Sequence, residues 1–462
     1  MGVIMENKKA DASLLVRYGF GEFACQISWY MINSYLMIFY TDIVGLTAGA
    51  ISIIMLIARV WDALNDPMMG MLCDRTRTRW GKFRPYLMFT PPFLAIFNIL
   101  TFTVFPLEGA AKVFVCLICY VGAGMLYTVV GTAYFSLVNV VAKDSQSKQN
   151  LSAARNVGNS VANILLSAIC MPLILKFSSA VGADGTAVPD ARGYFMVAVI
   201  FSVAMIPTFW IAASCKETYG SILHKTEEGG EKRSILDSIK TLLKNDQLVL
   251  IILNTLGGTI AIMGRMTLLS FYVIYVVGSY TLIAPIYLVI SVGTLLGSFL
   301  IPVATRRLGK KNYMILLNLV MITTFVLMYF STKNTVLIMV ISFVTGLSNT
   351  GQGVSYGMIS DSIDYCDYKY GIREEGLSSS FLTLGVKFAT AVIGTCGVLF
   401  LDKTGYVPNQ IQTPEVQQSI NFLINIVPAI CVGVALIPLF FFKLSNEKMA
   451  EISAVLEERR SK

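Results

Sequence analysis

Charged residues and histidine are both scarce in this chain of 462 residues. Only 14% of the residues are charged and 55% are hydrophobic, whereas a soluble globular protein carries about 25% charged residues. The composition therefore excludes an ordinary soluble protein. The single histidine, His224, lies in a polar stretch near the middle of the chain. A metal site or a membrane proton relay built from histidines is therefore excluded as well.

The chain also lacks long polar stretches, because apolar runs recur along its whole length. A hydrocarbon core about 30 Å thick requires about 20 apolar residues from each helix that crosses it. Twelve runs of this kind predict an all-α membrane protein with twelve transmembrane helices. The predicted spans are 16–40, 46–73, 86–106, 111–141, 151–175, 193–214, 248–277, 281–303, 313–331, 335–360, 376–401 and 418–443.

The nine cysteines form no pattern that indicates chemistry. Cys116 and Cys119 make a C-x-x-C sequence, but it falls within a predicted membrane helix. Packing in the core is favoured there over a metal knuckle or a redox pair.

Basic residues are concentrated on one predicted side of the membrane. Most of the 36 Lys and Arg residues lie in the two tails and in the loops of that side, whereas the other side carries Lys112, Lys176, Arg192, Lys333 and Lys403. This asymmetry predicts a multi-pass protein of the cell (plasma or inner) membrane with both termini in the cytoplasm. It also explains the net charge of +8 without nucleic-acid binding.

A polar segment near the middle divides the predicted spans into two sets of six. The predicted organisation is an N-terminal six-helix bundle (1–215), a cytoplasmic linker (216–246), a C-terminal six-helix bundle (247–443) and a cytoplasmic tail (444–462). The linker sequence EKRSILDSIKTLLKND has apolar residues at helical spacing, which predicts an amphipathic helix on the membrane surface.

The two predicted halves resemble one another in their basic loops. DRTRTRWGKFRPY follows the second span and TRRLGKKNY follows the eighth span, at the corresponding place. Repeated halves of this kind are typical of duplicated transporter folds.

Several charged residues fall inside the predicted spans, where insertion of a charge at the bilayer centre costs roughly 2.5–3.5 kcal/mol. Such residues are candidates for function. They are Glu22, Arg59, Asp62, Asp66, Arg155, Arg265 and Lys387.

The second span holds the most informative set of these charges. Arg59, Asp62 and Asp66 share an arc of about 60° on a helix, with Asn65 near its edge. At 1.5 Å per residue from a helix end near Cys73, Asp66 lies about 11 Å and Asp62 about 17 Å into the membrane. Carboxylate and amide oxygens suit a small hard cation such as Na⁺. A proton held by one carboxylate, or a static Arg–Asp–Asp network, are the alternatives.

Longer motifs give a definite resemblance. Y-G-F-G at 18–21, Y-T-D at 40–42, W-D-A-L-N-D-P at 61–67 and R-W-G-K-F-R-P at 79–85 occur in order, followed by D-x-x-D-Y-x-D-Y-K-x-G-x-R at 361–373 and G-Y-V-P-N at 405–409. Together they resemble the glycoside–pentoside–hexuronide:cation symporters, a melibiose permease-like family of the major facilitator superfamily. The similarity runs from about residue 18 to residue 406.

The resemblance implies a binding site for the coupling cation. The acids of the D-x-x-N-D-P motif bind that cation in the family, which assigns Asp62, Asn65 and Asp66 as ligands here. Thr128 is implied as a further oxygen ligand on the fourth span.

The resemblance also implies sugar-binding positions, and several of them depart from the galactoside-transporting pattern. Two acidic positions correspond here to Gln26 and Gly131, and an aromatic platform corresponds to Phe135. Arg155 and Lys387 retain the basic residues of the fifth and eleventh spans. The missing acids put galactoside recognition in doubt, and the two cations favour a hexuronide or another acidic glycoside as one possible substrate.

Three further residues complete the predicted sugar site. Trp29 and Tyr127 offer apolar faces on which a pyranose ring could stack, with helix packing as the alternative. Thr383 lies one turn before Lys387 on the same helical face.

The basic loop after the second span and the acidic motif before the eleventh could pair as a cytoplasmic gate, with solvated topology signals as the alternative. The candidate gate residues are Arg79, Lys82, Arg84, Asp361, Asp364 and Arg373.

These features predict a monomeric secondary active transporter. It would import a glycoside, oligosaccharide or hexuronide with Na⁺ by alternating access, with no cofactor besides the coupling cation and no nucleic-acid partner. The alternatives are H⁺ coupling, or transport of an amphiphile such as a lysolipid. A transporter-like sensor is disfavoured because no signalling domain is evident. An enzyme is disfavoured because no nucleophile–base pair or metal cluster with catalytic spacing is evident.

Overall fold

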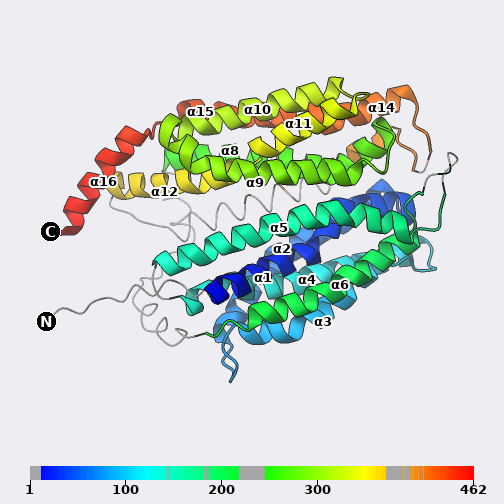
Figure 1. The fold of residues 1–462 in the computed structure, drawn as a ribbon, viewed down its shortest axis with the longest axis horizontal. Helices are drawn as coiled ribbons and strands as arrows, with labels where there is room; N and C mark the ends of the chain where they lie inside the picture. Colours follow the sequence, from blue (N-terminus) through cyan, green and yellow to red (C-terminus); the bar gives the residue numbers. More distant parts are fainter. Residues whose placement is uncertain are drawn as a thin grey trace. The chain divides into compact units, whose positions relative to one another are not determined.

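The computed structural model describes residues 12–142, 145–181, 185, 187–217, 245–370, 385, 389, 396–397, 399–403, 405–408 and 410–461. The described residues are almost entirely helical, as predicted (Figure 1). The chain divides into two compact units, one of Met1–Leu46 with Ile57–Gly230 and one of Thr47–Leu56 with Glu231–Lys462. The predicted linker helix lies in 218–244, outside the described residues.

The first unit is a bundle built from six long helices. α1 packs against α5 and α6, and α3 packs against α4 and α6. The helices are α1 (Ala12–Ile38), α2 (Ala48–Arg75, whose first residues group with the second unit), α3 (Arg84–Thr101), α4 (Gly109–Val141), α5 (Ser145–Phe177) and α6 (Ala191–Ala213).

Glycines in the Y-G-F-G motif allow α1 to approach its neighbours closely. A Cβ atom added at Gly21 would lie 2.2 Å from the ring of Tyr134 on α4. One added at Gly158 on α5 would lie 2.3 Å from the carbonyl oxygen of Gly19. Small residues give membrane helices this kind of close backbone contact, so the motif fixes how α1 packs between α4 and α5.

The second unit repeats the bundle with more interruptions. α8 packs against α15 and α12, and α9 packs against α11. The helices are α8 (Asp246–Phe271), α9 (Ile283–Leu308), α10 (Lys310–Phe330), α11 (Thr335–Ser348), α12 (Gly351–Tyr370), α14 (Pro414–Asn421), α15 (Val427–Phe441) and α16 (Asn446–Ser461).

Two features of the second unit add to the sequence-based expectation. The predicted span 335–360 lies within one candidate membrane span, Thr335–Lys369, and its helix is interrupted at Asn349 and Thr350 between α11 and α12. The predicted tail contains helix α16, which packs against α12 and buries Ile452 and Leu456 in the core of the unit.

Short π-helices occur at the same place in both halves. η1 (Phe39–Ile43) follows α1, and η4 (Tyr272–Val276) follows α8. Each leads into a glycine with positive φ, Gly45 at 72° and Gly278 at 81°. This matched detail supports the duplication that the basic loops indicated. A third π-helix, η5 (Phe422–Ile426), joins α14 to α15.

Nine helical segments of the described residues are long and apolar enough to cross a membrane. They correspond to nine of the twelve predicted spans. The predicted spans 16–40 and 86–106 are seen as α1 and α3, and most of 376–401 lies outside the described residues.

Candidate functional site

The charged face of α2 is directed toward α4. The Nη1 atom of Arg59 donates to Oδ2 of Asp62 at 3.3 Å. Its Nη2 atom donates to the hydroxyl oxygen of Tyr120 on α4 at 3.5 Å. About a quarter of the Arg59 side chain and a fifth of the Asp62 side chain are exposed, at 24% and 20%. The pair is therefore partly screened from water but still reachable by a small ion.

Asn65 continues this face one turn further along α2. It is 5% exposed, and its Nδ2 atom donates to the carbonyl oxygen of Met125 at 3.5 Å. Because the amide nitrogen faces this carbonyl, the amide oxygen is the atom that can bind a cation. Asp66 is the next residue and is half-buried, as is Thr128, which lies three residues after Met125 on α4. The structure thus places the predicted cation ligands on facing stretches of α2 and α4.

Gly124 is a residue of this site that the sequence reasoning missed. A Cβ atom added there would lie 3.4 Å from Oδ1 of Asp62 and 3.8 Å from the indole of Trp29. Both distances are ordinary van der Waals contacts, so Gly124 lies beside Asp62 and Trp29 but is not required for their approach to α4. A single glycine in an apolar helix gives no sequence signal of this position.

A second polar cluster surrounds Glu22 on α1. Its Oε1 atom accepts from Nε2 of Gln26 and from Nδ2 of Asn159, each at 3.2 Å. Its Oε2 atom lies 3.7 Å from Nε of Arg155, and the guanidinium of Arg155 lies 5.1 Å from the centre of the Phe135 ring. Gln26, Arg155 and Phe135, three predicted sugar-binding residues, therefore gather around one buried carboxylate.

Asn159 is not among the predicted sugar-site residues, whereas the sequence places Glu22 one turn from Gln26 on the same helical face, as a carboxylate close to that site. Asn163 donates to Oδ1 of Asn159 at 2.8 Å and extends the cluster along α5. A signal was present in the sequence, since Arg155, Asn159 and Asn163 recur every four residues and so share one helical face.

The two predicted stacking aromatics pack on one another. The rings of Trp29 and Tyr127 are stacked with their centres 4.5 Å apart, and Tyr120 lies 6.4 Å from Trp29 on the same helix as Tyr127. Helix packing between α1 and α4 accounts for these contacts. Gly131 is buried on α4, and an added Cβ would meet only the Phe135 ring, at an ordinary 3.9 Å.

The predicted gate residues of the first half form hydrogen bonds and ring contacts within their own unit. The carboxylate of Glu217 accepts from the backbone N–H groups of Lys82, Phe83 and Arg84 at 2.7–2.9 Å, which satisfies donors at the start of α3. The Nε atom of Arg84 donates to the carbonyl oxygen of Ala213 at 2.6 Å. The guanidinium of Arg79 lies 4.2 Å from the Trp80 ring centre.

The predicted gate residues of the second half also bind partners within their own unit. Both carboxylate oxygens of Asp361 on α12 accept from Nζ of Lys310, at 2.7 and 2.8 Å. Asp364 is half-buried one turn further. Pairing between the two loops stays a prediction. Arg373, Thr383 and Lys387 lie outside the described residues.

Arg265, predicted as a charge within a span, is 1% exposed on α8. Its Nε atom lies 3.4 Å from Oδ1 of Asn425 and its guanidinium lies 4.9 Å from the Phe325 ring centre. Among the described residues, Nη1 and Nη2 have no hydrogen-bond partner.

Comparison with known proteins assigns the chain to a family. Residues 17–446 match the family described as "MFS/sugar transport protein". The chain belongs to this family. It is therefore an integral membrane transporter and not an enzyme, and the predicted all-α membrane fold of the major facilitator type is confirmed.

Individual relatives agree with the family. The chain is 31% identical over 434 residues to the isoprimeverose transporter of Lactiplantibacillus pentosus, covering 93% of this chain and 88% of that protein. It is 28% identical over 463 residues to a glucuronide carrier protein homolog of Escherichia coli strain K12, covering 98% and 97%. Both bear out the resemblance to glycoside–pentoside–hexuronide:cation symporters.

Solved structures show the same fold at low sequence identity. A D-xylose–proton symporter superposes with a TM-score of 0.65 at 12% identity, covering 94% of this chain and 97% of that one. A bacterial homologue of the lysosomal transporter Spinster gives a TM-score of 0.62 at 12% identity, covering 95% and 97%.

Proposed function

We propose that this transporter carries a glycoside, oligosaccharide or hexuronide into the cell together with Na⁺, by alternating access. The family and its sugar-transporting relatives support sugar as the substrate class. Both termini face the cytoplasm, as the distribution of basic residues indicates, and the monomer is the working unit.

The observation that carries the proposal is the polar face of α2 set against α4. Asp62, Asn65 and Asp66 place two carboxylates and one amide within an apolar span, and Arg59 supplies a single positive charge beside them. Two carboxylates one turn apart repel each other, so a bound cation stabilises the ionised pair. The amide of Asn65 favours Na⁺ over H⁺, because an amide oxygen ligates a metal cation but does not take up a proton.

The cluster around Glu22 is the proposed sugar site. Gln26 and Asn159 can exchange hydrogen bonds with sugar hydroxyls, and Phe135, at 44% exposed, offers a ring face. Arg155 is held at the edge of this cluster by Glu22. An acidic glycoside could pair with Arg155 as its carboxylate approaches, which makes hexuronides one favoured substrate class.

Uptake into vesicles under separately imposed gradients tests the proposal. Purified full-length protein is reconstituted and offered labelled isoprimeverose, a methyl glucuronide and melibiose under an inward Na⁺ gradient, an inward pH gradient, or neither. We expect accumulation with the Na⁺ gradient alone. Accumulation driven only by the pH gradient would replace Na⁺ by H⁺, and uptake insensitive to both gradients would remove the symporter assignment.

A double substitution tests the assignment of the sugar pocket. Gln26→Asp with Gly131→Asp restores the two acids of the galactoside pattern, and Gly131 has room for a side chain. The ratio of melibiose to glucuronide uptake is expected to rise about tenfold, equivalent to about 1.4 kcal/mol. An unchanged ratio would show that Gln26 and Gly131 do not line the sugar pocket.

A further inference from the structure

The second half has an open cavity among its basic residues, where the loop between α9 and α10 meets the start of α16. Its volume is about 310 Å³, within the range of about 300–1,000 Å³ that is typical of small-molecule sites. Two stretches of chain, 307–312 and 444–447, supply the lining. We name it the basic cavity.

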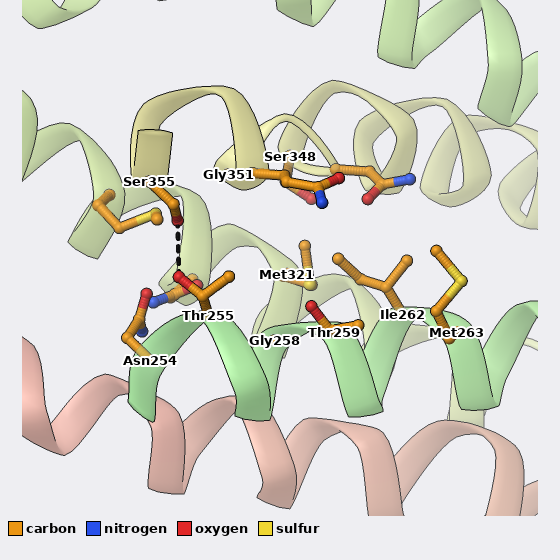
Figure 2. A pocket seen from close by; sticks show the side chains of 14 residues that line it. Asn254, Thr255, Gly258, Thr259, Ile262, Met263, Met321, Ser348, Gly351 and Ser355 are labelled. Carbon is orange, nitrogen blue, oxygen red and sulfur yellow. Dashed lines mark hydrogen bonds between the residues drawn. The ribbon is translucent and has the colours of Figure 1, made fainter. Parts of the chain in front are cut away.

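A second cavity of this half, between α8, α10 and the break that separates α11 from α12, is much smaller (Figure 2). Its volume is about 90 Å³, which suits a few water molecules, since each occupies about 30 Å³. Figure 2 shows Thr255 and Ser355 there, and their hydroxyl groups bind each other at 3.0 Å. The basic cavity is larger, and charged side chains line it.

Three basic side chains line the basic cavity, and two of them also bind groups of the protein. Nζ of Lys310 donates to both carboxylate oxygens of Asp361, so the charge of Lys310 is balanced. Nζ of Lys311 donates to the carbonyl oxygens of Phe440 and Phe442, at 3.2 and 2.6 Å. These acceptors are neutral, so Lys311 keeps a positive charge beside the cavity.

Arg307 is the third basic residue of the lining and adds a second positive charge. Its side chain is exposed, and it forms no ion pair with any other described residue. The carboxylate of Glu447 also belongs to the lining, but Glu447 is exposed too, so water weakens its attraction for the cations. The cavity therefore combines a net positive charge with space for an anion.

The corresponding loop of the first half already holds an anion. The sequence R-W-G-K at 79–82 matches R-L-G-K at 307–310. In the first half the carboxylate of Glu217 lies against Gly81 and accepts from three backbone N–H groups at the start of α3, at 2.7–2.9 Å. A negative charge suits this place, because a helix start leaves N–H groups without partners and carries the positive end of the helix dipole.

In the second half an amide takes the place of this carboxylate. A Cβ atom added at Gly309 would lie 3.7 Å from Oδ1 of Asn446, and Nδ2 of Asn446 donates to the carbonyl oxygen of Thr305 at 3.3 Å. Among the described residues, no side chain accepts from the first three N–H groups of α10. The second half thus repeats the anion-binding helix start without its built-in carboxylate.

The surroundings of the basic cavity favour a lipid as the source of an anion. Leu308 in the lining is 48% exposed, and Phe440 and Phe441 at the end of α15 are 61% and 63% exposed. Lys311 joins the cavity to this helix end through the carbonyl oxygen of Phe440. Basic pockets at the ends of membrane helices bind anionic lipid headgroups, and exposed apolar side chains beside them can contact the acyl chains.

We propose that the basic cavity binds the phosphate group of an anionic phospholipid such as phosphatidylglycerol. The phosphate oxygens accept from the N–H groups at the start of α10 and from Arg307 and Lys311, as the carboxylate of Glu217 accepts from the start of α3. The acyl chains lie along the exposed apolar residues at the ends of α9 and α15. This site depends on neither the sugar nor the coupling cation.

Two neighbouring arginines provide a matched pair of variants. Arg307 lines the cavity, whereas Arg306, which is also exposed in the last turn of α9, is not part of the described lining. Arg307→Gln and Arg306→Gln therefore remove the same charge inside the cavity and beside it. A third variant, Asn446→Glu, supplies the carboxylate that Glu217 supplies in the first half.

Purified full-length protein in a neutral detergent is titrated with phosphatidylglycerol, or with net-neutral phosphatidylcholine of the same chain length. The readouts are the apparent Tm and the amount of bound lipid measured by native mass spectrometry. We expect phosphatidylglycerol to bind the wild type and Arg306→Gln equally, and to bind Arg307→Gln about tenfold more weakly. Asn446→Glu should no longer respond to this lipid, because its own carboxylate occupies the site.

Three results would overturn the proposal. Equal loss of binding in Arg306→Gln and Arg307→Gln would mean general attraction to a basic surface. An equal response of the wild type to the two lipids would mean that the anionic headgroup is not recognised. Stabilisation by sodium phosphate but not by phosphatidylglycerol, against sodium chloride of equal ionic strength, would make free phosphate the ligand in place of the lipid.

The arginine pair decides the matter by itself if Asn446→Glu does not fold. None of these measurements uses a sugar or an ion gradient, so their outcome is separate from that of the proposed function.

Discussion

The two halves share a frame and differ in their buried charges. In the first half, Arg84 at the start of α3 donates to the carbonyl oxygen of Ala213 at the end of α6. In the second half, Lys311 at the start of α10 donates to the carbonyl oxygens of Phe440 and Phe442 at the end of α15. In both cases a cation satisfies carbonyl groups that a helix end leaves without partners. The loops that place these cations each turn at a glycine of positive φ.

The two halves differ in the charged side chains that lie within their membrane spans. The first half pairs its buried acids with Arg59 and Arg155. The second half buries Arg265 against the Phe325 ring, and its Nε atom lies 3.4 Å from Oδ1 of Asn425. The frame thus holds helices in place in both halves, while the chemistry at membrane depth has diverged. Under the proposed function, ion coupling belongs to the first half.

Removing the acids of α2 should have the largest effect. Asp62→Asn and Asp66→Asn are each expected to reduce the ratio of internal to external sugar to about one. A single cation crossing 100 mV supplies about 2.3 kcal/mol, equivalent to about fiftyfold accumulation. Asp42→Asn on η1 is the control. Asp42 lies at a helix end, so this variant should retain sugar accumulation. Intact accumulation in both α2 variants would show that coupling does not use Asp62 and Asp66.

Neutralising Glu22 should change selectivity. Glu22→Gln removes the negative charge that faces Arg155, so preference should move from neutral sugars toward the glucuronide. Hydrogen bonds to charged groups contribute about 1.5–3 kcal/mol, which predicts a change of about tenfold or more in the ratio of the two KM values. The double variant Glu22→Gln with Arg155→Gln should return the ratio toward the wild type. If it matches the single variant, the two residues do not act together.

Replacing the glycine of each basic loop by alanine allows the effect of the two loops on the Tm of the protein to be compared. Gly81 has φ of 116° and Gly309 has φ of 81°, so alanine is strained at both by about 1–3 kcal/mol. At Gly81 an added Cβ would also lie 2.6 Å from the carboxylate of Glu217, whereas the nearest atom at Gly309 is 3.7 Å away, in Asn446. The apparent Tm in detergent should therefore fall further for Gly81→Ala. Equal shifts would mean that the contact with Glu217 contributes little.

The helices that begin the sixth span of each half, α6 and α14, should differ slightly in how pH affects their stability. Asp190 begins α6 and accepts from the backbone N–H groups of Gly193, Ser179 and Ala180. Partial burial opposes ionisation, but these N–H groups outweigh it and lower the pKa of Asp190 below its usual 3.8. The stabilisation is therefore present above pH 4 and is lost as the pH falls through the lowered pKa.

Asp190→Asn should lower the Tm at pH 6 by an amount that reflects about 1 kcal/mol or less, and the difference should shrink as the pH falls below 4 toward the lowered pKa. Thr413 precedes α14, the start of the last span, without capping it through its side chain. The Thr413 side chain hydrogen-bonds the fully exposed carboxylate of Glu415, so Thr413→Ala should lower the Tm by less than Asp190→Asn does. A constant Asp190→Asn difference across this range would contradict the role of the charge.

Apolar runs and ordered motifs were sufficient to predict the helices and the family, because the bilayer demands long apolar segments. The face of α2 was predictable for the same reason, since helical periodicity alone brings Asp62 and Asp66 together. Glu22 was noted, but its partners depend on how α1 packs against α5. The interruption at Asn349 could have been read from the polar, glycine-rich sequence S-N-T-G-Q-G at 348–353.

The contacts of Glu217 and Asn245 anchor the chain within each half. Glu217 accepts from the backbone N–H of Lys82 before α3 at 2.7 Å, and Asn245 donates to the carbonyl oxygen of Ser362 on α12 at 2.8 Å. A force applied to the chain at residue 217 or at residue 245 is therefore resisted by hydrogen bonds to another helix of the same half before it reaches α6 or α8.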